Sequence, residues 1–118
     1  MKTIDEAKCV KDLPVIIADQ HGIIIDVNEL FEAVFGWERR EIVGRMIAAI
    51  IPESLHDAHH LGFSRFLATG IPSLLDRPLA LRAVTKDGRE FDAEHYIIAE
   101  KSNGEWMFAA TIRPLGKS

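Results

Sequence analysis

The chain has 118 residues, is 47% hydrophobic and 27% charged, and carries a net charge of −4. This length suits one domain with a single core. The negative charge argues against nucleic acid and against an anionic membrane surface as partners. No apolar run approaches the roughly 20 residues that span a bilayer, so we expect no membrane insertion. Cys9 is the single cysteine, which excludes a disulfide scaffold and predicts a protein of the reducing cytoplasm.

Residues 1–11 carry a helical pattern with Thr3 as the N-cap, and we expect them to form a helical cap on one domain at residues 12–118. Ile4, Ala7 and Val10 recur at helical spacing, a stripe too short to be stable alone. The stripe is therefore expected to pack on the outer face of a sheet or on a second copy of the chain. We predict a homodimer that forms through this segment.

Two predicted strands, residues 13–18 and 23–27, flank a turn in which Gly22 supplies a positive φ. Asn28 is expected to cap a helix at residues 29–35, and Gly36 to end it. Two short helical segments follow, at residues 37–43 and 46–51. Pro52 stops the second of them.

Residues 52–70 read as a longer helix, with Ser54 as the N-cap, Asp57 in a capping box and Gly70 after the last turn. Three of the five histidines fall within about a third of its circumference, on the side of Phe63: His56, His59 and His60. We expect this to be the inward side. Buried neutral imidazoles without partners are unfavourable, so the cluster indicates a function.

The rest of the chain has the sequence pattern of three strands, at residues 79–85, 89–100 and 105–113, with tight turns at 86–88 and 102–104. Two strands, a group of short helices, one longer helix and a three-strand meander predict an α+β domain. We expect one antiparallel sheet with helices on one face.

Three segments resemble PAS domains. Residues 14–45 read PVIIADQHGIIIDVNELFEAVFGWERREIVGR, residues 85–94 read TKDGREFDAE, and residues 111–115 read TIRPL. Pro114 departs from the family pattern, in which an acidic residue follows the arginine. The resemblance implies a five-stranded antiparallel sheet in the order 2-1-5-4-3. It also implies a sensory module, not an enzyme, that acts on an output signalling domain.

The segment HDAHHLGFSRFLATG, residues 56–70, is similar to the haem-binding helix of rhizobial oxygen-sensor kinases. A gapless alignment through the S-R-F pair and the K-D-G turn places their proximal histidine on His59. Their distal arginine falls on Leu79, so the group that holds oxygen in those sensors is missing. The resemblance implies haem b as cofactor and a diatomic gas, oxygen first, as the signal.

Haem PAS domains of aerotaxis receptors offer a second arrangement, with a proximal histidine just before the long helix and a tryptophan on the last strand. His56 and Trp106 stand at about those places. We therefore expect His56 to bind the iron, with His59 as the second choice. Neutral imidazole is a strong axial ligand, and an indole N–H can donate to bound dioxygen, which is partially negative.

The expected pocket combines these groups with one face of the meander. Strand alternation places Trp106, Phe108 and Ala110 on one face. His95 shares a strand face with Ile97, and is either a second polar group near the ligand or an exposed histidine at a strand end. The full set of expected cofactor contacts is His56, His59, Leu81, His95, Ile97, Trp106, Phe108 and Ala110.

Three rival interpretations remain. His56 to His60 contains H-D-x-x-H, a relative of a zinc-protease motif, but aspartate is one methylene short for the general base and no third ligand is evident. A flavin is the second, held without a covalent bond because Cys9 lies far from the middle helix. The third is a PAS domain without cofactor that serves only in dimerisation.

Overall fold

The computed structural model describes residues 3–69 and 78–115, and for Gly62, Phe63 and residues 65–69 it describes only the backbone. One antiparallel sheet forms the centre of the molecule, in the order β2-β1-β5-β4-β3. This order confirms the prediction. The strands are β1 (Val15–Asp19), β2 (Ile24–Val27), β3 (Pro78–Val84), β4 (Glu90–Ser102) and β5 (Glu105–Pro114).

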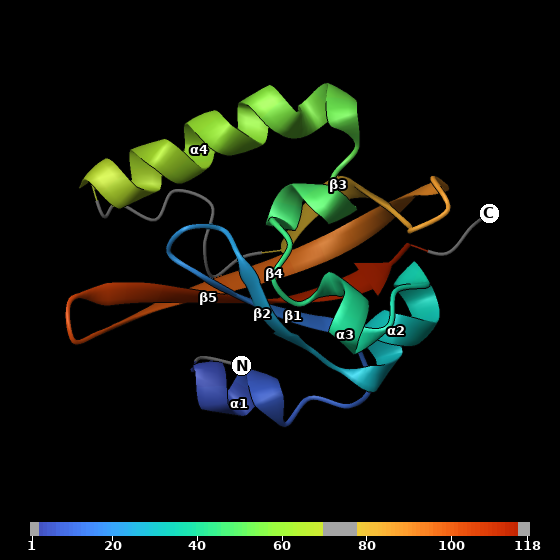
Figure 1. Cartoon of the computed structure of the whole chain (residues 1–118), viewed down its shortest axis with the longest axis horizontal. Helices are drawn as coiled ribbons and strands as arrows, with labels where there is room; N and C mark the ends of the chain where they lie inside the picture. Colours follow the sequence, from blue (N-terminus) through green and yellow to red (C-terminus); the bar gives the residue numbers. More distant parts are fainter. Residues whose placement is uncertain (1–2, 70–77, 116–118) are drawn as a thin grey trace.

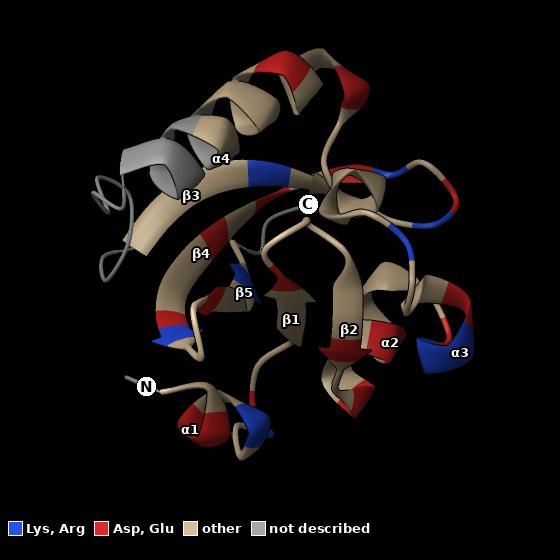
Figure 2. Cartoon of the chain, turned by 60° about the vertical axis from the view of Figure 1, so that its left-hand side comes forward, with Lys and Arg blue, Asp and Glu red and all other residues tan. Residues whose placement is uncertain are grey.

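Most helices lie on one face of the sheet, which we call the inner face (Figure 1). They are α2 (Glu29–Phe35), α3 (Arg39–Ile42), the 3₁₀ turns η1 (Ile47–Ile50) and η2 (Glu53–Leu55), and α4 (His56–Thr69). The short helix α1 (Ile4–Lys8) lies on the opposite, outer face. Figure 2 shows the same arrangement from another side, with α4 over β3 and α1 beyond the sheet.

Asn28 connects three elements at the start of α2. Its side-chain oxygen accepts hydrogen bonds from Phe31 N, which caps α2, and from Val15 N at the start of β1, at 3.0 and 2.9 Å. Its Nδ2 donates to the carbonyls of Leu13 and Val10, at 2.8 and 3.1 Å. The predicted cap is confirmed, and the same side chain also holds the connection between α1 and β1.

The start of α4 differs from the prediction. Ser54 is not the N-cap, because Glu53–Leu55 forms a 3₁₀ turn in which Leu55 N donates to Pro52 O at 2.9 Å, and the α-helix begins at His56. His60 is exposed, so the prediction that all three histidines of this segment face inward is wrong. The predicted end at Gly70 lies outside the described residues.

The sheet separates two apolar clusters. The inner cluster packs Ile16, Ala93 and Ile112 of the sheet against Phe31 and Phe35 of α2, whose rings stack at 4.3 Å between centroids. The outer cluster consists of Ile4, Ala7, Val15, Ile17, Ile98 and Ala109. Burial of both faces explains why β1, with the run VIIA, is buried almost throughout.

The helix α1 belongs to the outer cluster. Thr3 caps it, as predicted, in a capping box with Glu6. Ile4 and Ala7 are 5% and 0% exposed against the outer face. The apolar stripe therefore takes the first of the two positions expected for it, on the chain's own sheet, and dimerisation stays a prediction.

We expect Ile4→Ala to lower the free energy of unfolding by about 2 kcal/mol, because it removes a buried aliphatic side chain from the outer cluster. The matched control is Lys8→Ala, an exposed change on the same helix, which should stay within about 0.5 kcal/mol of the parent. Urea unfolding of both variants measures the difference. Equal stability of the two would mean that α1 does not hold to the sheet in solution.

Candidate functional site

The strand registers assign the expected pocket residues to one face. Ile16 pairs with Ala110, which pairs with Ile97, and Ile16 and Ala110 belong to the inner cluster. Facing partners share a side of a sheet and successive residues alternate. The sheet residues predicted for the pocket therefore all lie on the inner face: Leu81, His95, Ile97, Trp106, Phe108 and Ala110.

His56, the first residue of α4, is half-buried and engaged with the backbone before it. Its Nε2 lies 2.7 Å from Ile51 O and 3.1 Å from Ala48 O. Carbonyl oxygens only accept, so this nitrogen carries its hydrogen and donates to them. In this position His56 closes η1 against the start of α4, and the lone pair of its neutral ring is on Nδ1.

His59 lies one turn further along α4 and is also half-buried. Burial lowers the pKa of His59 below the usual value for histidine, and the neighbouring His60 and then His56 lower it further through charge repulsion. The rings of His59 and His60 are 5.5 Å apart. His59 is therefore held toward its neutral form, in which a ring nitrogen has a lone pair.

His95 lies in the interior of β4, not at an exposed strand end. It is 9% exposed, and its partners across the sheet are Leu79 on β3 and Ile112 on β5. Burial lowers the pKa of His95, an effect that hydrogen bonding to the backbone of Ala93 opposes in part. Its Nδ1 has no hydrogen-bond partner in the part of the chain that the structure describes.

Trp106 lies near the hairpin end of β5, opposite Lys101 on β4. The Lys101 ammonium is 5.6 Å from the centre of the indole, and the ring of Phe108 stacks at 6.5 Å. The backbone N–H of Trp106 donates to the side chain of Gln20 at 3.2 Å. As expected, Trp106 and Phe108 share a face, but Trp106 is at its rim.

The inner face is not closed along β3. Leu81 pairs with Ala93 and so faces the helices, yet it is 42% exposed. Leu79 and Ile112 flank His95 on this face and were not among the expected contacts. Ile112 has the same strand parity as Phe108 and Ala110, and that signal could have identified it.

A groove lies at the β2 edge of the sheet, beside α1. It is a groove of about 300 Å³ between α1, β1, β2 and α2, lined among others by Lys8, Lys11, Asp26 and Arg39. Its rim carries both charge signs, and Arg39 pairs with Asp26 at 2.6 Å. The groove thus shares none of the residues expected to contact a cofactor.

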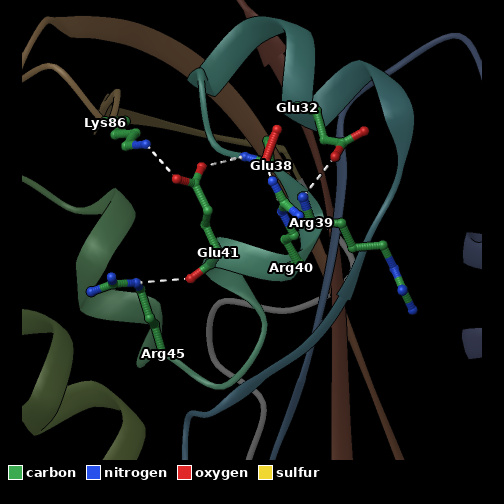
Figure 3. Close-up of polar contacts among 7 residues, drawn as sticks. All are labelled: Glu32, Glu38, Arg39, Arg40, Glu41, Arg45 and Lys86. Atoms are coloured by element: carbon green, nitrogen blue, oxygen red, sulfur yellow. Dashed lines mark hydrogen bonds and ion pairs between the residues drawn. The ribbon is translucent and has the colours of Figure 1, made fainter.

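Polar residues around α3 form a surface network (Figure 3). Glu41 accepts from Lys86 Nζ at 2.6 Å and from Glu38 N at 2.9 Å, and its backbone oxygen accepts from Arg45 at 2.9 Å. The hydrogen bond from Lys86 is the main cause of the lowered pKa of Glu41. Arg45 and Lys86 also lie over the ring of Trp37, so the network ties α3 to the turn between β3 and β4.

Within the described ranges, no group of three or more His, Cys, Asp or Glu side chains is placed to hold a metal ion. This gives the zinc-protease interpretation of H-D-x-x-H no support, whereas haem iron needs only one protein ligand. In the same ranges, no helix is both long and apolar enough to cross a bilayer.

A five-stranded antiparallel sheet in the order 2-1-5-4-3 with helices over one face is the α+β architecture expected for a PAS domain. The chain belongs to the PAS domain family, whose model matches residues 12–113. PAS domains are sensory modules and generally not catalytic. The expectation of this family from the sequence is thus confirmed.

Two relatives come from rhizobia. An uncharacterised protein of Azorhizobium caulinodans is 37% identical over 102 residues, which cover 86% of this chain and 14% of the relative. The sensor protein FixL of Bradyrhizobium diazoefficiens is 29% identical over 100 residues, which cover 85% of this chain and 20% of FixL. The chain therefore matches a fifth or less of the length of these proteins.

Solved structures agree on the fold. The PAS domain of an HTR-like protein from Haloarcula marismortui is 22% identical with a TM-score of 0.70, covering 89% of this chain and 83% of that one. A LOV protein of Rhodobacter sphaeroides is 14% identical with a TM-score of 0.72, covering 96% and 65%.

Proposed function

We propose that this chain is a haem-binding sensory domain that detects a diatomic gas, with oxygen as the first candidate. It would serve in the cytoplasm as the input module of a longer signalling protein, paired with an output domain and with a second copy of itself. The likeness to a sensor protein along 85% of the chain supports the sensory part of this proposal. The haem part rests on the histidines of α4 and on the inner face.

The observation that carries the proposal is the half-buried imidazole of His59, whose pKa is lowered by burial, on the helix above the inner face. A haem would take a neutral imidazole nitrogen of the protein as a ligand of its iron, and the iron would supply the site at which a diatomic gas binds. His56 was the first choice from the sequence, and donation from its Nε2 to two carbonyls leaves the lone pair of the neutral ring on Nδ1. We favour His59 as the iron ligand because burial lowers its pKa, with His56 as the alternative.

The aliphatic residues of the inner face support the haem part of the proposal. Leu81 is exposed there although it points toward the helices, and Ile97 and Ala110 are only half-buried. Together they give an apolar surface that a flat macrocycle can cover. Covering Leu81 and the neighbouring aliphatic side chains would stabilise the complex by about 25 cal/mol for each Å² of apolar surface removed from water.

Titration of the purified chain with haemin tests the proposal. We expect a Soret band that saturates at one haem per chain, and a shift of that band when the reduced protein meets carbon monoxide. The control is the double variant His56→Ala with His59→Ala, which should not give the saturating band. A protein that remains colourless with haemin refutes the proposal and leaves the cofactor-free interpretation. A yellow protein with a flavin spectrum supports the flavin alternative.

A further inference from the structure

The sheet has two edge strands, β2 and β3, and in the described part of the chain β3 is the one with an open edge. At the other edge, the segment after α3 pairs with the backbone of β2, where Ile24 N donates to Arg45 O and Gly44 N donates to Ile24 O, both at 2.8 Å. The strand order leaves β3 with β4 as its one described neighbour (Figure 2). The middle of β3, residues 80–82, is exposed. An open edge of this kind can pair with another strand.

The backbone groups that point out of this edge follow from the hydrogen bonds of β4. Leu115 N donates to Asp92 O at 2.9 Å, so the N–H and C=O of Asp92 point toward β5. In an antiparallel pair the residue opposite, Arg82, then points its own N–H and C=O away from β4. Strand alternation extends this to Ala80 and Pro78. Pro78 agrees with it, because proline is tolerated in a strand where its missing N–H would face away from the sheet.

The strand β3 is complementary to a second copy of itself in one antiparallel register. With a two-fold axis at Leu81, the two Leu81 side chains face each other and Ale-free backbone groups of Ala80 meet those of the partner's Arg82. This register brings together two leucines that are each 42% exposed, and it forms about four backbone hydrogen bonds in the symmetric pair. With the axis at Arg82, two arginines would face each other instead. Like charges directly opposite each other are unfavourable, so the axis at Leu81 is preferred.

The charges on the outer face favour the same register. Arg82 pairs with Asp92 on β4 at 3.2 Å, and the β4 neighbour of Ala80 is Glu94. With the axis at Leu81, the small side chain of Ala80 lies between Glu94 and the partner's Arg82. Opposite charges therefore approach each other across the joined edge, and no like charges are placed face to face.

We propose that the free edge of β3 is a dimer interface, at which two copies of the chain join their sheets with a two-fold axis at Leu81. This inference rests on the second copy in the proposed function and not on haem. The sequence favoured α1 as the interface, but the apolar stripe of α1 is buried on the chain's own sheet, with Ile4 5% and Ala7 0% exposed. Facing side chains lie side by side on one face of a sheet, so the pairing leaves the inner face of β3 open to a ligand.

Disulfide formation tests the register. Leu81→Cys and Arg82→Cys are compared under mild oxidation in a Cys9→Ser background, which removes the exposed native thiol. In the proposed dimer the two Leu81 Cα atoms are about 4.5 Å apart, within the range that a disulfide spans. The two Arg82 Cα atoms are about 8 Å apart, beyond that range. We expect Leu81→Cys to give a covalent dimer on a non-reducing gel and Arg82→Cys to remain monomeric there.

Sedimentation equilibrium of the chain without haem measures the dimer itself. Ala80→Pro removes an N–H that points away from β4 and toward the second copy. We expect its dissociation constant for the dimer to rise by at least about tenfold, because hydrogen bonds are lost in both copies. Its circular dichroism should remain that of the parent. The control Ala80→Ser keeps this N–H and should keep the dissociation constant of the parent.

The outcomes that would overturn the interface are distinguishable. A parent chain that stays monomeric and gives no disulfide from Leu81→Cys removes the second copy from the proposed function and this interface with it, whereas the haemin titration decides the haem part separately. A disulfide from Arg82→Cys and not from Leu81→Cys would overturn the register. A dimer that neither cysteine variant cross-links would form through another surface, so the second copy would stand and the β3 interface would be wrong. If Ala80→Pro does not fold, the two cysteine variants still decide.

Discussion

Replacing His59 by alanine is expected to lower the affinity for haem by more than about a hundredfold. Loss of a residue that only supports a metal ligand already costs about ten- to a hundredfold, and His59 is proposed as the ligand itself. The neutral form of His59, favoured by its burial, is the form that binds iron. Haemin titration followed by the Soret band measures the effect.

Two neighbouring histidines provide matched controls. His60→Ala removes an exposed imidazole from the same helix and should leave the titration unchanged. His56→Ala should keep the haem spectrum but lower the free energy of unfolding by about 1–3 kcal/mol, because the carbonyls of Ala48 and Ile51 lose a donor. If His56→Ala alone loses haem, the aerotaxis-type assignment from the sequence is the better one.

Most of the fold could be predicted because local signals and the family resemblance agreed. Asn28 starts α2 and Gly36 ends it as expected, with Gly36 at φ +79°. Gly22 and Gly104 have the positive φ that their turns require. The error at Ser54 has a physical reason. A serine before an apolar periodic segment predicts an N-cap, but Pro52 starts a 3₁₀ turn that includes Ser54 and delays the helix to His56.

The candidate site was less predictable, because alternation assigns a face and not a position along it. Strand parity correctly grouped His95 and Ile97, and Trp106 and Phe108, on the inner face. It could not show that Trp106 lies at the hairpin end while His95 is flanked by strands on both sides. Nor could helical spacing show that His56 would turn its Nε2 toward the carbonyls before α4.

Asn28→Ala is expected to lower the free energy of unfolding by about 3 kcal/mol. Loss of the α2 cap accounts for about 1 kcal/mol, and the bonds to Val15, Leu13 and Val10 add about 1 kcal/mol or less each. Asn28→Ser keeps an oxygen for Phe31 N and should cost about 2 kcal/mol. The control Glu29→Ala, an exposed change at the next residue, should cost about 0.5 kcal/mol. Urea unfolding ranks the three variants.

The hydrogen bonds of Asn28 also predict which segments the substitutions destabilise. Its Nδ2 holds the carbonyls of Val10 and Leu13, so the segment between α1 and β1 is fastened to α2 through one side chain. Both substitutions remove this donor, so we expect the amides of α1 to exchange hydrogen faster in both variants. The amides at the start of α2 should exchange faster only in Asn28→Ala, because that variant alone lacks an oxygen that caps the helix. Faster exchange at α2 with α1 unchanged would show that Asn28 acts only as a helix cap. In that case the outer-face packing of Ile4 and Ala7 would hold α1 by itself.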